Sequence, residues 1–357
     1  MKIIHCSDLH LDSKLDTTLS PDMAKARNYE LSKSFYRMVE YAHKHNVQVI
    51  MICGDLFESS SPKVTTVQFI LSVIKKYPHI TFLYLRGNHD EQIVFSDQTL
   101  PSNLKLFDKK WRYYQVGQVI FAGIEFDEYN YASLYDSLQL SNETTNIVMM
   151  LGQIGSKAEQ YVINLSAFSK YPVDYLALGH IHRHNIQLLP PRGKWCYSGC
   201  LEGRGFDETG KKGFVLLDIA QQSVHTTFVP FSTRVHHKMN LDITDIEEIS
   251  DIIEQIKYII SEIPSKDSIR ITLTGTRSAS EPIDIDFIEQ IFKESFYHID
   301  FQNAIRYTYE HELLDDVIGL KKAFIRNVQN DNSLCENEVL DIIELGLKAM
   351  RGEEILI

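Results

Sequence analysis

The sequence predicts an α/β fold of mixed sheets flanked by helices, followed by a small α+β unit and C-terminal helices. Up to about residue 230, short apolar runs rich in Ile, Val and Tyr alternate with amphipathic stretches. This alternation is typical of sheets that carry helices on their faces. The length of 357 residues also suggests more than one domain, since domains average ~150 residues.

The first part of the chain supplies most of the strands. We expect buried strands at Lys2–Cys6, Val47–Cys53, Ile80–Leu85, Val119–Ile124, Asn146–Leu151 and Asp174–Leu178. Helices are expected between the first three, at Arg27–His45 and Val64–Tyr77. Four later strands, at Ile186–Leu189, Lys194–Ser198, Gly213–Asp218 and Val224–Pro230, follow without long helices. The first domain is therefore expected to end in antiparallel pairs.

The pattern changes near residues 231–240. Beyond it we expect a helix, a strand, a helix and a strand, at Asp245–Ile263, Ser268–Thr274, Asp284–Phe292 and Asn303–Glu310. Two more helices are expected in 319–357, the second preceded by a capping box from Ser333 to Glu336 and ended by Gly352. The expected domains are 1–235, 241–318 and 319–357.

Composition excludes several classes of protein. Apolar residues make up 44% and charged residues 24%, which is unlike a disordered or collagen-like chain. Five cysteines without a C-x-x-C pair fit reduced thiols better than a disulfide framework. The net charge of −12 disfavours DNA binding by bulk attraction. No signal peptide and no apolar run of ~18–20 residues is evident, so we expect a soluble cytoplasmic protein without membrane contact.

Four polar motifs each follow directly on a predicted strand. They are Asp8-Leu9-His10, Gly54-Asp55, Gly87-Asn88-His89-Asp90 and Gly179-His180-Ile181-His182. Functional sites of open α/β sheets assemble at the carboxyl ends of the strands. These clusters are therefore expected to converge at one edge.

The residue types in the motifs predict a pair of metal ions. Imidazole, carboxylate and amide oxygen together suit ions such as Mn²⁺, Fe²⁺ or Zn²⁺. Two ions ~3.5–4 Å apart need a bridging carboxylate, and Asp55 is the natural candidate. A single D-x-H or H-x-H is usually a surface turn, but four such clusters in order have no comparable structural explanation.

The motif set D-x-H, G-D, G-N-H-D and G-H-x-H resembles that of the calcineurin-like metallophosphoesterases, which implies their sandwich fold. The stretches His5–Leu11, Gly54–Phe57 and Tyr197–Glu208 are similar to SbcD-type DNA-repair exonuclease subunits, especially the YhaO-like bacterial branch. That resemblance implies a capping domain, a partner-binding C-terminal segment and a homodimer.

The resemblance also implies a role for each motif residue. Two divalent ions, most often Mn²⁺ in this family, would share Asp55. The ligands implied for the first ion are Asp8, His10 and His182, and those for the second are Asn88 and His180. His89 would protonate the leaving oxygen while Asp90 orients its ring.

One position departs from the family pattern. The family has a further second-ion histidine in an H-G-Q motif, where this chain has Leu151-Gly152-Gln153. Leucine has no lone pair to donate, so Leu151 marks a lost ligand and a weakened second site. An engineered and a natural substitution are both open from the sequence.

Two further features bear on partners. Arg204, in the family-like loop, and Arg183 are candidate DNA contacts, although ordinary solvated surface is the alternative. The terminal helix carries Val339, Ile343, Leu347 and Met350 at helical spacing. This stripe either packs on its own domain or, as the resemblance implies, binds an SbcC-type SMC-like ATPase.

The sequence therefore favours a metal-dependent DNA nuclease subunit for double-strand-break processing, with activity lowered by Leu151. Two alternatives remain open. One is a phosphatase or phosphodiesterase of a non-DNA substrate, and the other is a catalytically weak scaffold. The segments after residue 240 favour the nuclease subunit over a plain phosphatase, whereas Leu151 favours the scaffold.

Overall fold

The computed structural model describes residues 1–352 except 16–18, 94, 96–99, 127–133, 158, 309–318 and 332. Its contacts divide the chain into two compact units, Met1–Val235 and His236–Ile357. The first consists of mixed sheets flanked by helices, which confirms the fold class predicted from the sequence. The expected boundary at 318 and the last two residues of the strand expected at 303–310 lie outside the described residues.

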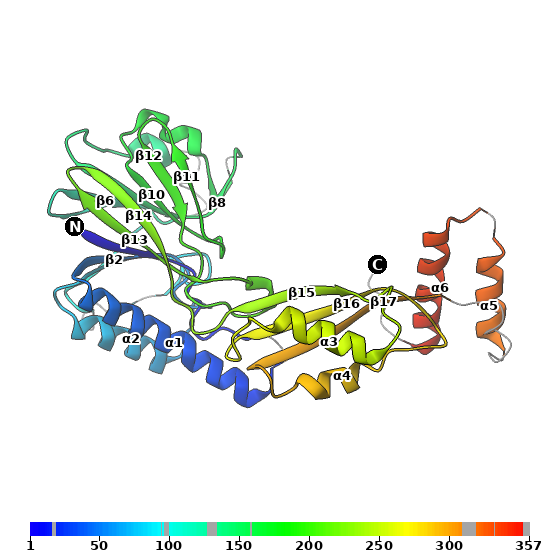
Figure 1. The fold of residues 1–357 in the computed structure, drawn as a ribbon. Helices are drawn as coiled ribbons and strands as arrows, with labels where there is room; N and C mark the ends of the chain where they lie inside the picture. Colours follow the sequence, from blue (N-terminus) through cyan, green and yellow to red (C-terminus); the bar gives the residue numbers. More distant parts are fainter. Residues whose placement is uncertain are drawn as a thin grey trace. The chain divides into compact units, whose positions relative to one another are not determined.

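Two six-stranded sheets form the first unit, with strand orders β14-β13-β1-β2-β3-β4 and β11-β12-β10-β7-β6-β5 (Figure 1). The strands of the first sheet are β1 (Lys2–Cys6), β2 (Val47–Cys53), β3 (Thr81–Leu85), β4 (Leu104–Leu106), β13 (Gly213–Ala220) and β14 (Ser223–Pro230). Those of the second are β5 (Arg112–Val116), β6 (Val119–Gly123), β7 (Thr145–Leu151), β10 (Tyr175–Gly179), β11 (Asn185–Leu189) and β12 (Gly193–Tyr197). A small pair, β8 (Gln153–Ile154) and β9 (Val162–Ile163), follows β7.

The central strands of both sheets are parallel. β1 to β4 run parallel in the first sheet, as do β6, β7, β10 and β12 in the second. The late pairs β11–β12 and β13–β14 are antiparallel, as the sequence predicts. All the motif-bearing strands thus end at the same side of their sheet.

The core of the first unit lies in layers. Residues such as Ile3, Met51, Phe121 and Met149 fill the space between the two sheets. Helices α1 (Pro21–Lys44) and α2 (Val64–Lys76) cover the outer face of the first sheet. Because the central strands are buried on both faces, their sequences are continuous apolar runs rather than alternating ones.

The second unit contains three parallel strands and two helices that pack on them. They are β15 (His236–Asp242), α3 (Ile249–Ile260), β16 (Ser268–Ser278), α4 (Ile285–Phe292) and β17 (His298–Thr308). Strand β15 corrects the sequence analysis, which treated residues 231–240 as a boundary and expected only two strands. Its alternation of exposed and half-buried residues contains no apolar run that would reveal a strand.

Helices α5 (Leu320–Gln329) and α6 (Glu336–Arg351) pack against each other through Ile325, Ile343 and Leu347. Gly346 permits this approach, because a Cβ at that position would lie 2.1 Å from the Phe324 ring. Part of the predicted apolar stripe is therefore covered by α5.

The start of α6 differs from the prediction. The helix begins at Glu336, and the backbone N–H of Cys335 donates to the side chain of Glu338 at 2.7 Å. This contact is the second half of a capping box, placed two residues later than predicted. Gly352, at φ +72°, follows the last helical residue as expected. Within the described residues, no helix is long and apolar enough to span a membrane.

Candidate metal centre

The loops after β1, β2 and β10 are tied together by hydrogen bonds. The backbone N–H of Asp8 donates to the carbonyl of Gly54 at 3.1 Å, and that of His10 donates to the carbonyl of Asp55 at 2.9 Å. The N–H of His180 donates to Asp8 Oδ1 at 2.9 Å. Side chains from distant parts of the sequence thereby meet at one edge of the sandwich.

Four of the predicted ligands have a left-handed backbone. The angle φ is +54° at Asp8, +46° at His10, +49° at Asp55 and +97° at His180. Residues other than glycine rarely adopt such angles, and each costs about 1–3 kcal/mol. Strain of this kind persists only where the surroundings hold it, and it concentrates at functional sites.

Asp8, His10 and His182, predicted for the first ion, form a compact group. Their candidate ligand atoms all lie within 4.8 Å of one another. The two Nε2 atoms of His10 and His182 are 3.1 Å apart, and His182 Nε2 is 3.8 Å from Asp8 Oδ1. Asp8 and His10 are each only 1% exposed. This first set has the donors and the spacing for one divalent cation.

The second set, Asp55, Asn88 and His180, is less complete. Asp55 is 1% exposed, and its Oδ1 accepts the backbone N–H of His89 at 3.1 Å. Asn88 Oδ1 is buried and has no hydrogen-bond partner among the described residues. A buried amide oxygen without a partner is unfavourable, and a cation would satisfy it. In the described part of the chain, neither Asp55 nor His180 belongs to a group of three close His, Cys, Asp or Glu ligands.

Leu151 points into the second set. It is 1% exposed and ends β7, where it pairs with Gly179 at the end of β10. A Cβ added to Gly54 would lie 1.9 Å from Leu151 Cδ1, and one added to Gly87 would lie 2.6 Å from it. Leu151 therefore fills the space between the loops that carry Asp55 and Asn88. This is the place where the motif pattern predicts a missing ligand.

The contacts of Asp90 correct one sequence prediction. Its carboxylate accepts hydrogen bonds from the Gly87 N–H, the Phe57 N–H and the Tyr84 hydroxyl. Among the described residues, the group that faces His89 Nδ1 is instead the carbonyl oxygen of Glu58, at 3.0 Å. Asp90 thus shapes the backbone of its loop, and the ring nitrogen Nδ1 of His89 is oriented by the Glu58 carbonyl and not by Asp90.

Sequence analysis missed Glu58 and Glu208. Glu58 Oε2 lies 2.8 Å from His10 Nδ1, and Glu208 Oε1 lies 2.6 Å from His182 Nδ1. Metal-binding histidines usually donate their second ring nitrogen to such a carboxylate. Nothing in the local sequence marks these two among the 48 acidic residues. The only available signal is general: each metal-binding histidine needs an acceptor for its second ring nitrogen.

Burial sets the charge state of the ligands. Burial, with the charges of Asp8 and Asp90 added, raises the pKa of Asp55 to about 8. Burial also lowers the pKa of His10 and of His180, so both imidazoles are neutral near pH 7 and have lone pairs to donate. A site with excess buried carboxylate and neutral imidazole is chemically suited to divalent metal ions.

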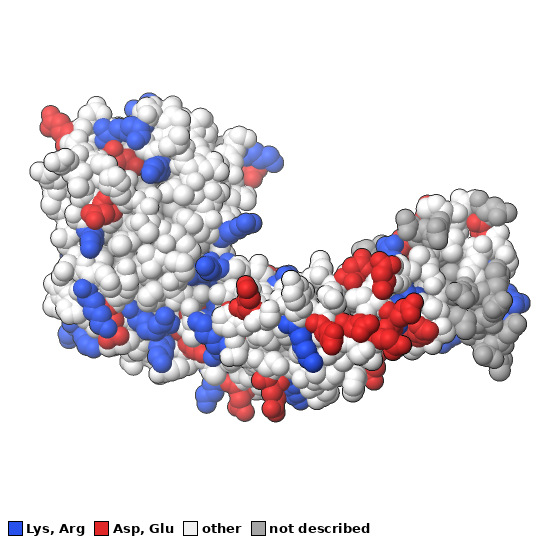
Figure 2. All heavy atoms as spheres, in the orientation of Figure 1, with Lys and Arg blue, Asp and Glu red and all other residues white. Residues whose placement is uncertain are grey.

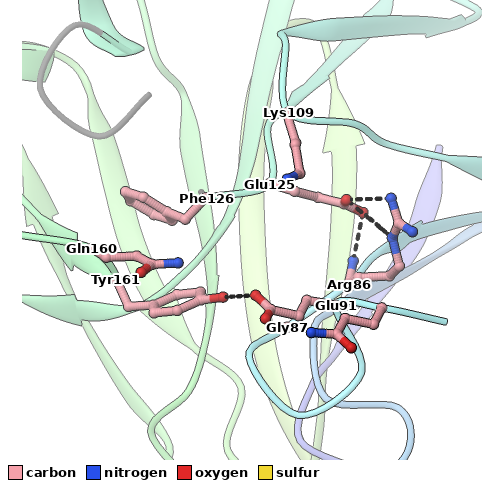
Figure 3. Close-up of a pocket in the computed structure, with 9 residues that line it drawn as sticks. Arg86, Gly87, Glu91, Lys109, Glu125, Phe126, Gln160 and Tyr161 are labelled. Carbon is pink, nitrogen blue, oxygen red and sulfur yellow. Dashed lines mark hydrogen bonds and ion pairs between the residues drawn. The ribbon is translucent and has the colours of Figure 1, made fainter. Parts of the chain in front are cut away.

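The loop that carries Asn88 is held at both ends (Figure 3). Before it, Arg86 forms an ion pair with Glu125, with NH2 2.6 Å from Oε2. After it, the Tyr161 hydroxyl donates to Glu91 at 2.8 Å. These residues, with Gly87, Gln92, Lys109, Phe126 and Gln160, line a cavity of about 350 Å³. The loop that carries Asn88, one member of the second set, therefore forms part of the wall of this cavity.

The two predicted DNA contacts lie in different settings. Arg183 is exposed and lines a cavity of about 610 Å³ together with His180, His182, Lys211 and Lys212. Arg204, in contrast, pairs with Glu58 and Glu208. On the face drawn in Figure 2, Lys and Arg of the first unit are interspersed with Asp, Glu and neutral residues.

A model of the family described as calcineurin-like phosphoesterase matches residues 1–184. YhaO of Bacillus subtilis (strain 168), described as an uncharacterized metallophosphoesterase, is 23% identical over 295 residues, 77% of this chain and 72% of that protein. The SbcD component of the nuclease SbcCD from Escherichia coli (strain K12) is 24% identical over 323 residues, 76% of this chain and 78% of that protein. The DNA double-strand break repair protein Mre11 of Aeropyrum pernix is 24% identical over 272 residues, 68% of this chain and 64% of that protein.

Asp55→Asn tests the charge balance of the site. Between the ordinary carboxyl pKa of 3.8 and about 8, the metal-free folded chain keeps a proton that the unfolded chain has lost. Its stability therefore falls as the pH rises through that range. In EDTA, we expect the native chain to lose about 4 kcal/mol more stability than Asp55→Asn between pH 5 and pH 8.5, because one proton is released over about three pH units. This corresponds to a further drop of roughly 8–16 °C in the melting temperature of the native chain.

The same variant tests the bridging role, because a neutral amide holds two cations poorly. Added Mn²⁺ should raise the melting temperature of the native chain and have much less effect on Asp55→Asn. Differential scanning fluorimetry measures both arms. Equal stabilisation of the two proteins by Mn²⁺ would contradict a ligand role for Asp55.

Proposed function

Because the chain belongs to the calcineurin-like phosphoesterase family, we propose that it is a metal-dependent nuclease that hydrolyses phosphodiester bonds of DNA. Membership confirms the family resemblance that the motifs predict. Calcineurin-like phosphoesterases use divalent metal ions, and the grouping of Asp8, His10 and His182 is the observation that carries the proposal. The choice of DNA as the substrate is supported by relatives that are named as a nuclease and as a break-repair protein, which match 76% and 68% of this chain.

In this proposal the two sets have unequal roles. Asp8, His10 and His182 would hold the first ion, Asn88 and His180 would hold the second, and Asp55 would be the ligand that the two ions share. Mn²⁺ is the expected metal because the family resemblance implies it, while the imidazole, carboxylate and amide donors by themselves suit Mn²⁺, Fe²⁺ and Zn²⁺. When bound, such ions supply positive charge that neutralises and polarises the scissile phosphate.

His89 is proposed to protonate the leaving oxygen. Its Nδ1 faces the Glu58 carbonyl oxygen at 3.0 Å, and because a carbonyl can only accept, Nδ1 carries a hydrogen. The ring packs edge-on against His10 at 4.8 Å, beside the first set. This leaves Nε2 as the atom from which a proton can pass to the substrate.

His89→Gln should slow hydrolysis by roughly 10²–10⁴-fold, the usual cost of losing a general acid–base group. Its Mn²⁺ content should stay close to that of the native chain. Elemental analysis of the protein and steady-state rates on one substrate check both points. If the metal is lost with the imidazole, His89 is a ligand in the group it forms with His10 and Glu58.

Leu151 favours a second candidate, a scaffold subunit with weak catalysis. The side chain is apolar and occupies the second set, so the second ion would bind at least ~10–100-fold more weakly than with a full ligand set. The first set does not involve Leu151. Weak occupancy of one site is thus expected together with a normal fold.

The deciding experiment compares the native chain with Leu151→His. We expect the variant to bind a second Mn²⁺ more tightly and to cleave linear DNA faster, because the imidazole restores a donor. Hydrolysis of the diester bis-p-nitrophenyl phosphate and of the monoester p-nitrophenyl phosphate by both proteins is measured alongside DNA cleavage. Preference for the monoester would identify a phosphatase, and inactivity of both proteins on all three would favour the scaffold. Equal metal binding and equal rates would show that Leu151 lies outside the site.

The C-terminal helices are proposed to bind an SbcC-type ATPase, in a complex with DNA that contains two copies of this chain. The basis is the similarity to a protein named as a subunit of SbcCD. On α6, Leu345 and Met350 are 45% and 37% exposed, whereas Ile343 and Leu347 are buried against α5. Met350 is therefore the exposed member of the stripe, and Leu345, outside the stripe, is a second exposed apolar residue of α6 that a partner could contact.

Leu345→Asp combined with Met350→Asp should abolish co-purification with the ATPase and leave the folded chain and its Mn²⁺ binding unchanged. Charges on exposed positions block an apolar contact without opening a cavity. Tyr258→Asp is a matched control, since Tyr258 is 76% exposed on α3. Loss of folding in the double variant, measured by circular dichroism, would indicate that these residues pack on their own unit. Retained co-purification would place the partner surface elsewhere.

A further inference from the structure

Five side chains around the first set form a closed ring. His10 Nδ1 lies 2.8 Å from Glu58 Oε2, which lies 2.9 Å from Arg204 NH1. Arg204 NH2 lies 2.7 Å from Glu208 Oε1, which lies 2.6 Å from His182 Nδ1. The ring closes through the two histidine Nε2 atoms, which are 3.1 Å apart.

The carboxylates determine which ring nitrogens are free. The guanidinium of Arg204 lies 2.9 Å from Glu58 Oε2 and 2.7 Å from Glu208 Oε1, which favours the ionised form of both carboxylates. An ionised carboxylate can only accept hydrogen bonds, so Nδ1 is the ring nitrogen that carries a hydrogen toward each carboxylate. Both Nε2 lone pairs are therefore available to one cation.

Arg204 is the member that joins the two halves of the ring. Its NH1 binds Glu58, while its Nε, its NH2 and its backbone N–H all donate to Glu208, at 3.0, 2.7 and 2.8 Å. A guanidinium presents donors in a fixed planar fork, whereas an ammonium is a point charge. Lysine could pair with one carboxylate here but could not reproduce this set of directions.

We propose that Arg204 is a positioning residue for the first ion, which acts by locking Glu58 and Glu208 and through them His10 and His182. This assigns Arg204 a role other than the DNA contact expected from the sequence. The proposal rests on the first-ion site of the proposed function and on no property of the substrate. The two arms of the ring differ in strength: Glu208 makes an aligned hydrogen bond to His182, whereas the Glu58 contact has only an ion-pair distance.

The test is calorimetric titration of the full-length protein with Mn²⁺ in the absence of DNA. Arg204→Lys should weaken the tightest Mn²⁺ site by ~10–100-fold, the range for partners of metal ligands. Glu208→Gln should weaken it more than Glu58→Gln, because Glu208 is 9% exposed and Glu58 30%. Arg192→Lys is the matched control, since Arg192 also pairs with a carboxylate, Asp174, at 2.8 Å and contacts none of the ring.

An unchanged Mn²⁺ affinity in folded Arg204→Lys would overturn the proposal. A raised KM for DNA together with that unchanged affinity would identify Arg204 as a DNA contact instead. Melting in EDTA checks the fold. If Arg204→Lys does not fold, the two glutamate variants decide. The proposal then requires that Glu208→Gln bind Mn²⁺ more weakly than Glu58→Gln, and an equal Mn²⁺ affinity in these two variants would overturn it. Because no DNA is present, a chain that binds Mn²⁺ normally but cuts no DNA would refute the nuclease function and leave the ring intact.

Discussion

Asp8 and Asp55 are buried carboxylates whose charges disfavour each other, and the arrangement of the first unit depends on this electrostatic cost. Each is 1% exposed, and burial with the charge of Asp8 holds the pKa of Asp55 at about 8. A protein core does not keep such a pair without compensation. Backbone donors supply part of it, since the N–H groups of His180 and His89 point at these oxygens. The rest of this electrostatic cost can be offset by a positive charge bound beside the two carboxylates, as a divalent metal ion would supply.

That arrangement strains the backbone at the ends of the strands. Left-handed angles at Asp8, His10, Asp55 and His180 are unfavourable for residues with a Cβ, although Asp and His adopt them more often than most. They persist because the strands behind them are fully buried and parallel, so that the ends of β1, β2 and β10 cannot move independently. The core between the sheets therefore stabilises the site as directly as any hydrogen bond within it.

How far the sequence predicts this structure depends on how local each signal is. Buried strands such as β2 and β10 are visible as apolar runs, and the residues that follow them carry recognisable motifs. Strand β15 is invisible because its residues alternate without a dominant apolar face. The partners Glu58 and Glu208 are invisible for another reason: each is an ordinary acidic residue until the fold places it beside a histidine ring. Asp90 shows the converse, since the family resemblance implied that it orients the His89 ring, whereas His89 Nδ1 faces the Glu58 carbonyl.

The effect of Leu151 follows from how the two sets are supported. The first set is held by polar contacts among loops, including the ring through Arg204, and Leu151 takes no part in them. The second set comes from the loops after β2, β3 and β10, beside the end of β7, where Leu151 belongs to the apolar cluster that joins the two sheets. Leucine therefore gains burial at the same point where a donor is lost, and its packing against Gly54 and Gly87 is compatible with the fold. If Leu151 lowers metal affinity as proposed, the loss would fall on the second set, because the two sets share Asp55 but not the contacts that hold their other members.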